Sequence, residues 1–203
     1  MSDKPGKTPP LPQSAAPSLA SLGNGQEPLA ELLAGMRVAI GLTNPKSPAN
    51  VGAVLRAAGC YGAQGVCYTG ERFARAARFH TDTQGANHQI PLLQVETYSA
   101  PLPAGMAKVC VELVEGATPL PAFEHPECAL YVFGPEDGSL RQQLVDSADA
   151  VVYMPTRGSM NLAASVNVLL YDRAAKAFNA SPADERAQIL AARDVNNRLR
   201  VKS

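Results

Sequence analysis

The chain has 203 residues, 46% of them hydrophobic, which is enough for one core of ordinary domain size. Its 18 basic and 18 acidic residues balance, which excludes a protein that binds any polyanion through bulk charge but leaves room for a local basic patch. No apolar run is long enough to cross a bilayer and no secretory signal pattern is present, so we expect a cytoplasmic protein without a membrane contact.

The first segment, residues 1–33, is predicted to be a disordered extension. It is rich in Pro, Ser, Gly and Ala, and it has too few large apolar side chains to offset the entropy cost of ordering. Compact structure is expected to begin near Met36. One domain at 34–180 and a helical tail at 181–203 complete the predicted organisation.

Short apolar strands then alternate with helical or loop segments. The expected strands are 36–42, 65–69, 90–95, 108–114, 129–133 and 151–154, and the expected helices are 51–61, 161–178 and 183–199. Apolar strands separated by helical stretches predict an α/β fold, with a mostly parallel sheet and helices on both faces.

Cysteine and histidine spacing does not indicate a metal site. The four cysteines stand singly, without a CxxC pair, and the three histidines are equally scattered. We therefore expect free thiols and no bound metal.

The first segment that could carry chemistry is the loop and helix at 44–66. Asn50 is predicted to cap a helix that begins at Val51, because the prolines before it disfavour an earlier helical start. On this helix Arg56 stands among small residues at helical spacing, which would let a ligand or another chain approach its guanidinium. An ordinary solvent-exposed arginine is the alternative. The glycines follow the helix instead of opening it, and GxGxxG is missing, so a dinucleotide-binding oxidoreductase is excluded.

The second such segment is the loop that follows the predicted strand 129–133. Gly134 permits a close backbone approach at the carboxyl end of the strand, where α/β folds bind ligands. Glu136 and Asp137 could orient a cationic or hydroxyl-bearing group. A turn with solvated acidic side chains is the alternative.

The third segment is the loop at 154–161, which leads into a nearly all-apolar helix. Asn161 begins this helix, and Ser165 and Asp172 lie on its face, so their polar atoms need partners. The rest of this helix must be buried.

In this order the three segments resemble the three signature motifs of the SpoU (TrmH-like) ribose 2′-O-methyltransferases, in the SPOUT superfamily. The matching residues are Asn50-x-Gly52-Ala53-x-x-Arg56, then Phe133-Gly134-x-Glu136-x-x-Ser139-Leu140, then Pro155 with Ser159-Met160-Asn161-Leu162 and Leu170-Tyr171-Asp172. The resemblance covers residues from about 36 to 178, and the third motif is similar to that of the shorter family members that act on tRNA.

The resemblance implies a SPOUT methyltransferase domain with a C-terminal deep trefoil knot, an exception to the rule that folds are unknotted. It implies S-adenosylmethionine as methyl donor, a homodimer, and an RNA substrate, tRNA before rRNA. The implied donor-binding residues are Leu113, Gly134, Met154, Ser159 and Met160, and the implied catalytic residues are Arg56, Asn50, Glu136 and Asn161.

Arg56 is the implied catalytic arginine, but a guanidinium is a poor base. Lowering its pKa from about 13 to 7 would cost about 8 kcal/mol, at about 1.36 kcal/mol per unit. We therefore expect Arg56 to hold the adjacent phosphate and stabilise the forming alkoxide, while the proton passes to phosphate or water. Asn50, Glu136 and Asn161 would position Arg56 and the ribose.

Two basic segments are candidates for RNA phosphate contacts, with a solvated charged surface as the alternative for each. Their residues are Arg72, Arg75, Arg78 and His80 after the second strand, and Arg193, Arg198, Arg200 and Lys202 in the tail. A catalytically silent, knotted RNA-binding or assembly protein is the alternative to the enzyme, and the presence of all four implied catalytic residues favours the enzyme.

Overall fold

The computed structural model describes residues 28–77, 90–179, 181–194 and 196–201. In this part of the chain seven strands form one sheet in the order β3-β2-β1-β6-β4-β7-β5, and every pairing is parallel. The strands are β1 (Val38–Leu42), β2 (Gly65–Tyr68), β3 (Leu92–Gln94), β4 (Met106–Val111), β5 (Thr118–Pro119), β6 (Cys128–Phe133) and β7 (Ala150–Tyr153). The α/β fold and the parallel sheet predicted from the sequence are confirmed.

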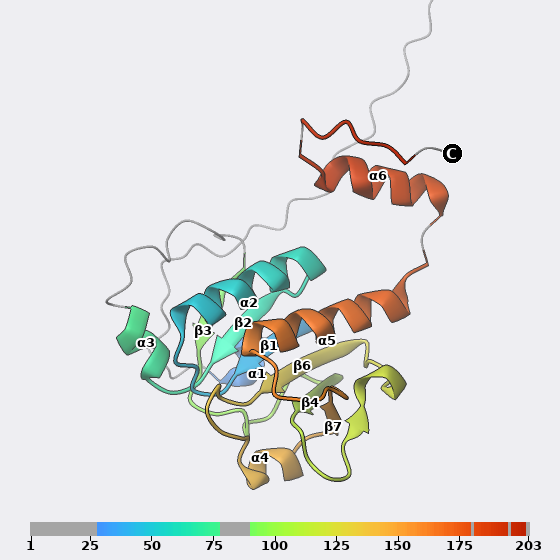
Figure 1. Ribbon diagram of the computed structural model, residues 1–203. Helices are drawn as coiled ribbons and strands as arrows, with labels where there is room; N and C mark the ends of the chain where they lie inside the picture. Colours follow the sequence, from blue (N-terminus) through green and yellow to red (C-terminus); the bar gives the residue numbers. More distant parts are fainter. Residues whose placement is uncertain (1–27, 78–89, 180, 195, 202–203) are drawn as a thin grey trace, which may run out of the picture.

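Helices lie on both faces of the sheet (Figure 1). They are α1 (Leu29–Leu32), α2 (Pro48–Tyr61), α3 (Arg72–Ala77), α4 (Gln142–Asp146), α5 (Leu162–Ala177) and α6 (Pro182–Ala192), with a 3-10 turn at Leu120–Ala122. The apolar sides of α2 and α5 belong to one buried cluster, while residues around α1 and α4 belong to a second cluster. In Figure 1, α6 stands away from the sheet.

The register of the sheet gathers loops that are far apart in the sequence. At the carboxyl end of the strands, Leu42 of β1 pairs with Phe133 of β6, and Phe133 pairs with Val111 of β4. Val111 in turn pairs with Val152 of β7. Parallel strands all end at the same edge. The loops that follow β1, β6, β4 and β7 therefore leave the sheet side by side.

The start of α2 differs from the sequence prediction. The N-cap is Ser47, whose hydroxyl accepts a hydrogen bond from the backbone N–H of Asn50 at 3.3 Å, and the helix begins at Pro48. Proline is well tolerated at the first helical position, because the N–H it lacks would have no partner inside the helix. The prediction that Asn50 caps α2 is wrong, and its side chain is left available for other contacts.

Two predicted boundaries are also wrong. Leu29 and Leu33 are buried around α1, so compact structure begins before Met36, while residues 1–27 of the predicted extension lie outside the described residues. At the other end α6 stops at Ala192, short of the predicted helix at 183–199.

A hydrogen-bonded network ties α5 to the segment before β6. His125 bonds to the Tyr131 hydroxyl through Nδ1 (2.7 Å) and to Asp172 Oδ2 through Nε2 (2.9 Å), and Lys176 Nζ donates to the same carboxylate at 2.6 Å. Arg173 Nη1 donates to the Tyr131 hydroxyl at 2.8 Å. Because that hydroxyl accepts from Arg173, its own proton points to His125 Nδ1, which favours a neutral imidazole protonated on Nε2.

This network should make stability depend on pH below neutrality. Burial, together with the positive charges of Arg173 and Lys176, lowers the pKa of His125 and outweighs the opposite effect of Asp172. For a histidine with a lowered pKa, the contribution to stability is full above about pH 6.5 and is lost as pH falls through the folded-state pKa. We expect the free energy of unfolding, measured with urea, to fall between about pH 6.5 and the folded-state pKa. His125→Gln keeps a donor and an acceptor but does not titrate. The free energy of unfolding of this variant should therefore fall less over the same pH range. An equal decline in both proteins would contradict the prediction.

Candidate functional site

A pocket of about 210 Å³ lies where the loops after β4, β6 and β7 meet the start of α5. Its wall contains all five residues implied to bind the methyl donor: Leu113, Gly134, Met154, Ser159 and Met160. Glu136 and the loop residues Thr156 and Gly158 also line it. Residues that the sequence resemblance singled out separately are thus brought to one cavity.

Glu112 shapes the wall between the loops after β4 and β6. Its carboxylate accepts hydrogen bonds from the backbone N–H of Leu140 (2.8 Å) and of Leu113 (3.1 Å). A Cβ on Gly134 would lie 3.2 Å from Glu112 Oε2 and 3.5 Å from Leu140 N, so a side chain there would crowd this contact. Sequence reasoning missed Glu112, because the strand was predicted to continue to Val114 and the residue belongs to no motif.

Three of the four residues implied to be catalytic form one chain of hydrogen bonds. Asn161 caps α5, with Oδ1 accepting from the backbone N–H groups of Ala163 (2.9 Å) and Ala164 (3.3 Å). Its Nδ2 donates to Asn50 Oδ1 at 3.0 Å, and Asn50 Nδ2 donates to Glu136 Oε1 at 3.1 Å. Because the cap uses the oxygen of Asn161, the direction of every donor in the chain is set.

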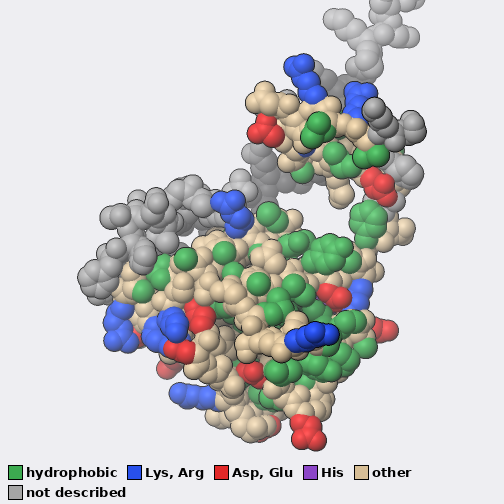
Figure 2. Space-filling model, viewed as in Figure 1, with side chains coloured by type: hydrophobic (Ala, Val, Ile, Leu, Met, Phe, Trp, Pro, Cys, Tyr) green, Lys and Arg blue, Asp and Glu red, His purple; other side chains and the backbone are tan. Residues whose placement is uncertain are grey.

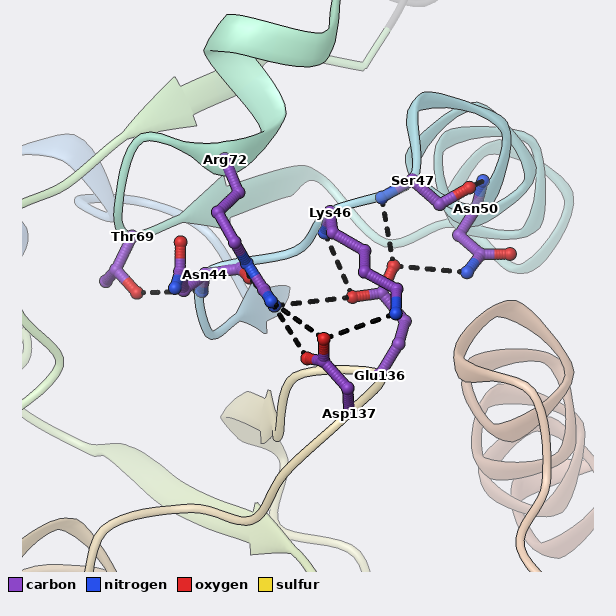
Figure 3. Close-up of polar contacts among 8 residues, drawn as sticks. All are labelled: Asn44, Lys46, Ser47, Asn50, Thr69, Arg72, Glu136 and Asp137. Atoms are coloured by element: carbon purple, nitrogen blue, oxygen red, sulfur yellow. Dashed lines mark hydrogen bonds and ion pairs between the residues drawn. The ribbon is translucent and has the colours of Figure 1, made fainter.

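Glu136 is the acceptor at which this chain ends. Its carboxylate also accepts from the backbone N–H groups of Lys46 (3.0 Å) and Ser47 (3.1 Å), as Figure 3 shows. Burial raises the pKa of Glu136, but these backbone donors and Asn50 outweigh burial and lower it. Glu136 is therefore a carboxylate at neutral pH, and its hydrogen bonds hold the loop before α2.

Ser165 borders the same pocket, and its hydroxyl donates to the carbonyl of Asn161 at 3.1 Å. Asp172, the other polar residue that the sequence placed on α5, is held in the His125 network. Both therefore have the partners that burial of this helix requires.

Arg56 lies on the exposed side of α2 and does not line the pocket. Among the described residues it has no hydrogen-bond or ion-pair partner, so its expected positioning by Asn50, Glu136 and Asn161 is not seen within one chain. The small-residue surface around it is open: a Cβ built on Gly52 would meet no atom within 4 Å.

The basic segment after β2 differs from the prediction. Arg72 is engaged by Asp137 and by the carbonyl of Asn44, so it is not a free phosphate contact. Arg75 is exposed, whereas Arg78 and His80 lie outside the described residues. In the tail, Arg198 and Arg200 are exposed and Arg193 is partly exposed, while Lys202 lies outside the described residues.

Asn161→Asp should separate the capping role of this residue from its role in the hydrogen-bonded chain. Aspartate caps helices as well as asparagine does, but it cannot donate to Asn50 Oδ1 at neutral pH. An oxygen would then face Asn50 Oδ1 at this exposed position, so we expect a small fall in the urea midpoint and clearly reduced activity. Asn161→Ala should also lose the helix cap, at a cost of about 1 kcal/mol of stability. If the aspartate variant retained full activity, the donor to Asn50 would be unimportant for function.

Neither a metal group nor a membrane helix is found in the described part of the chain. Within residues 28–77, 90–179, 181–194 and 196–201, no three His, Cys, Asp or Glu side chains are grouped to hold a metal ion. No helix in these ranges combines the length and apolar character needed to cross a membrane.

Several solved structures have a similar fold. An rRNA methyltransferase from Sinorhizobium meliloti matches with a TM-score of 0.57 and 22% sequence identity, over 70% of this chain and 57% of that chain. The SpoU methyltransferase AviRb from Streptomyces viridochromogenes, solved with AdoMet, matches at 0.55 and 19%, over 70% and 61%. A structure concerned with 2-OH methylation of C/U34 on tRNA matches at 0.54 and 22%, over 68% and 94%. This chain thus spans less than two thirds of the first two structures, and these likenesses show the fold.

Sequence comparison gives the family. No curated protein matches the chain. The profile of the SpoU rRNA methylase family matches residues 37–171, which run from the residue before β1 into α5 and include the pocket and the hydrogen-bonded chain beside it. The protein therefore belongs to the SpoU rRNA methylase family.

Proposed function

We propose that this protein transfers a methyl group from S-adenosylmethionine to a ribose 2′-hydroxyl of RNA. The observation that carries the proposal is the hydrogen-bonded chain from Asn161 through Asn50 to Glu136, at the edge of a pocket lined by the implied donor-binding residues. Family membership supports it, as do a similar structure solved with AdoMet and another concerned with 2-OH methylation.

The residues around the pocket suit S-adenosylmethionine. Apolar side chains of Met154, Met160 and Leu162 offer a surface for the adenine ring, and exposed backbone groups at the ends of β4 and β6 offer hydrogen bonds. Gly134 leaves open a space that a Cβ would fill. Two carboxylates, Glu112 and Glu136, also line the pocket, which favours a cationic ligand. The donor supplies an electrophilic methyl group on its sulfonium.

The protein's own part in the reaction is to position the ribose and to stabilise charge. Arg56 would hold the phosphate next to the target ribose and stabilise the developing alkoxide, while the hydroxyl proton leaves to phosphate or water. Asn50 and Asn161 lie beside the pocket, joined to it by the hydrogen bond from Asn50 to the pocket residue Glu136, and the ribose would lie next to them. Glu136, ionised and fully engaged, would keep this edge in place.

We propose that the active form is a homodimer with its RNA site built across the subunit interface. Val168 and Tyr171 on α5 are 40% and 63% exposed, and Tyr61 at the end of α2 is 38% exposed. Figure 2 shows hydrophobic side chains on the face of the molecule that carries these two helices. Arg56 shares the exposed surface of α2 and does not line its own pocket, which suits a site that two subunits complete. Light scattering should give twice the 21.3 kDa mass of one chain.

We also propose that the C-terminal part of the domain forms the deep trefoil knot that the family resemblance implies. The family membership supports this proposal. In the structure the end of α5 contacts the segment between β4 and β6, where Lys176 Nζ donates to the carbonyls of Leu120 (2.6 Å) and Phe123 (2.9 Å). We further propose that the protein acts in the cytoplasm.

Tritium transfer from methyl-labelled S-adenosylmethionine tests the function. The acceptor should be total RNA from cells that lack the gene, separated into tRNA and rRNA fractions. Labelled RNA should yield ribose-methylated, alkali-resistant dinucleotides, and we expect the tRNA fraction to carry most of them. Absence of transfer, together with absence of donor binding by calorimetry at millimolar concentration, would favour the alternative of a silent RNA-binding protein.

A further inference from the structure

Arg72, the first residue of α3, joins two loops that come from distant parts of the chain. Its Nε and Nη2 donate to the carbonyl of Asn44 at 2.9 and 2.6 Å. Its Nη1 donates to both carboxylate oxygens of Asp137, at 2.9 and 3.0 Å. Figure 3 shows this side chain lying between the loop after β1 and the loop after β6. All three nitrogen atoms of the guanidinium are therefore engaged within the protein.

Both partners of Arg72 adjoin the residues that hold Glu136. Asp137 directly follows Glu136, and it also accepts from Lys46 Nζ at 3.2 Å. Asn44 lies two residues before Lys46, whose backbone N–H donates to Glu136. Arg72 thus fixes both the backbone that supplies the donors and the loop that supplies the acceptor.

The backbone at Asn44 is held by several contacts. Its φ is +43°, in the left-handed region that asparagine enters more readily than most other residues with a side chain. Its N–H donates to Thr69 Oγ1 at 3.2 Å, and its carbonyl accepts from Arg72. Gly70 makes room for it, because a Cβ at Gly70 would overlap the Asn44 side chain. Three residues that follow β2 therefore hold the turn that leads into α2: Thr69, Gly70 and Arg72.

We propose that Arg72 is a positioning residue for methyl transfer: it holds the turn at Asn44 and the loop at Asp137, and so sets the Glu136–Asn50–Asn161 chain at the pocket edge. This inference rests on the proposed function. The alternative is a direct contact between Arg72 and an RNA phosphate. The ion pair with Asp137 argues against it, since binding a phosphate would require breaking that pair and placing a second anion beside Asp137 and Glu136.

Kinetics of Arg72→Ala distinguish the two roles. Loss of alignment at the pocket edge should lower kcat by about 10- to 100-fold, since a small misplacement can cost about 100-fold in rate. The salt dependence of the KM for RNA should not change. A phosphate contact would instead leave kcat near the wild-type value, raise KM and lower the slope of log KM against log salt by about 0.7 to 0.9. That second pattern would overturn the proposal.

Two further variants make the comparison specific. Arg72→Lys keeps a charge that can pair with Asp137 but cannot also form the two-pronged contact with Asn44, so we expect only partial recovery of kcat. Arg37→Ala is the matched control: it removes an exposed arginine and its ion pair with Glu127 at the opposite end of β1, and kcat should stay at the wild-type value. Full recovery by lysine, or equal losses in the alanine variants, would overturn the proposal.

A readout that needs no activity separates failure of this inference from failure of the proposed function. In Arg72→Ala, the side-chain amide NMR signals of Asn50 and Asn161 should shift, and the backbone amides of Lys46 and Ser47 should exchange with solvent faster. The Arg37→Ala protein should show neither change. Unchanged signals and exchange in Arg72→Ala would overturn the inference even if the wild-type protein methylated RNA.

Discussion

Arg56→Lys is expected to lower the rate of methyl transfer to RNA by about 100-fold, the effect of removing one well-placed charge-stabilising donor. Lysine keeps the positive charge, but it lacks the planar fork that holds two phosphate oxygens or a phosphate and an alkoxide together. Single-turnover rates at saturating donor concentration measure the effect. Turnover near the wild-type rate would contradict the proposal that Arg56 holds the phosphate and stabilises the alkoxide. It would instead favour a role as a base, which a lysine could fill.

The rest of the molecule should be unaffected by this change. Arg56 is exposed and has no partner among the described residues, so the urea midpoint should stay within error of wild type. Donor affinity measured by calorimetry should also stay unchanged, because Arg56 does not line the pocket of its own chain. A loss of donor binding in the variant would instead place Arg56 in the donor site, contributed by the second subunit.

Glu136→Gln is expected to reduce both stability and activity. Only 10% of the Glu136 side chain is exposed, and its carboxylate accepts three hydrogen bonds. Glutamine would turn an NH₂ group toward the N–H of Lys46 or Ser47, so a donor would face a donor. Hydrogen bonds to charged groups contribute about 1.5–3 kcal/mol each, and we expect a loss of about 2–4 kcal/mol in urea unfolding. Methyl transfer should fall by about 100-fold as the pocket edge loses its alignment.

Acid titration and a neighbouring variant provide controls for Glu136. Because the pKa of Glu136 is lowered, its contribution to stability is present above about pH 4.3 and is lost as pH falls through the folded-state pKa. Glu136→Gln should lack this part of the acid-induced loss. Asp137→Asn makes the same chemical change on an exposed neighbour and should shift the urea midpoint much less. Equal shifts of the urea midpoint in Glu136→Gln and Asp137→Asn would show that the hydrogen bonds accepted by Glu136 contribute no special stability.

Sequence patterns and local capping rules were less successful at the site than in the sheet. Both Ser47 and Asn50 are good N-cap residues. Pro48 fits the first position of a helix capped by Ser47, a local signal that the prediction of Asn50 did not use. The contact of the Asn50 side chain with Glu136, which lies 86 residues later, could not be predicted from the local sequence. Arg72 was predicted to contact an RNA phosphate, or else to lie on a solvated surface, because its partners, Asn44 and Asp137, come from other loops.

The sequence by itself determined the parallel sheet, the motif residues and six of the seven strands that the structure describes, but it did not indicate the short strand β5. Apolar runs specify strands buried on both faces, and the motif residues stand at strand ends that the same runs locate. The tertiary structure decided which side chains meet. It formed the hydrogen-bonded chain of Asn161, Asn50 and Glu136. It also placed Arg72 against Asp137, and Glu112 against the backbone of Leu140 in the pocket wall. The physical reason is that such hydrogen bonds need donors and acceptors placed to within a few tenths of an ångström, and only the register of the whole sheet brings those loops together.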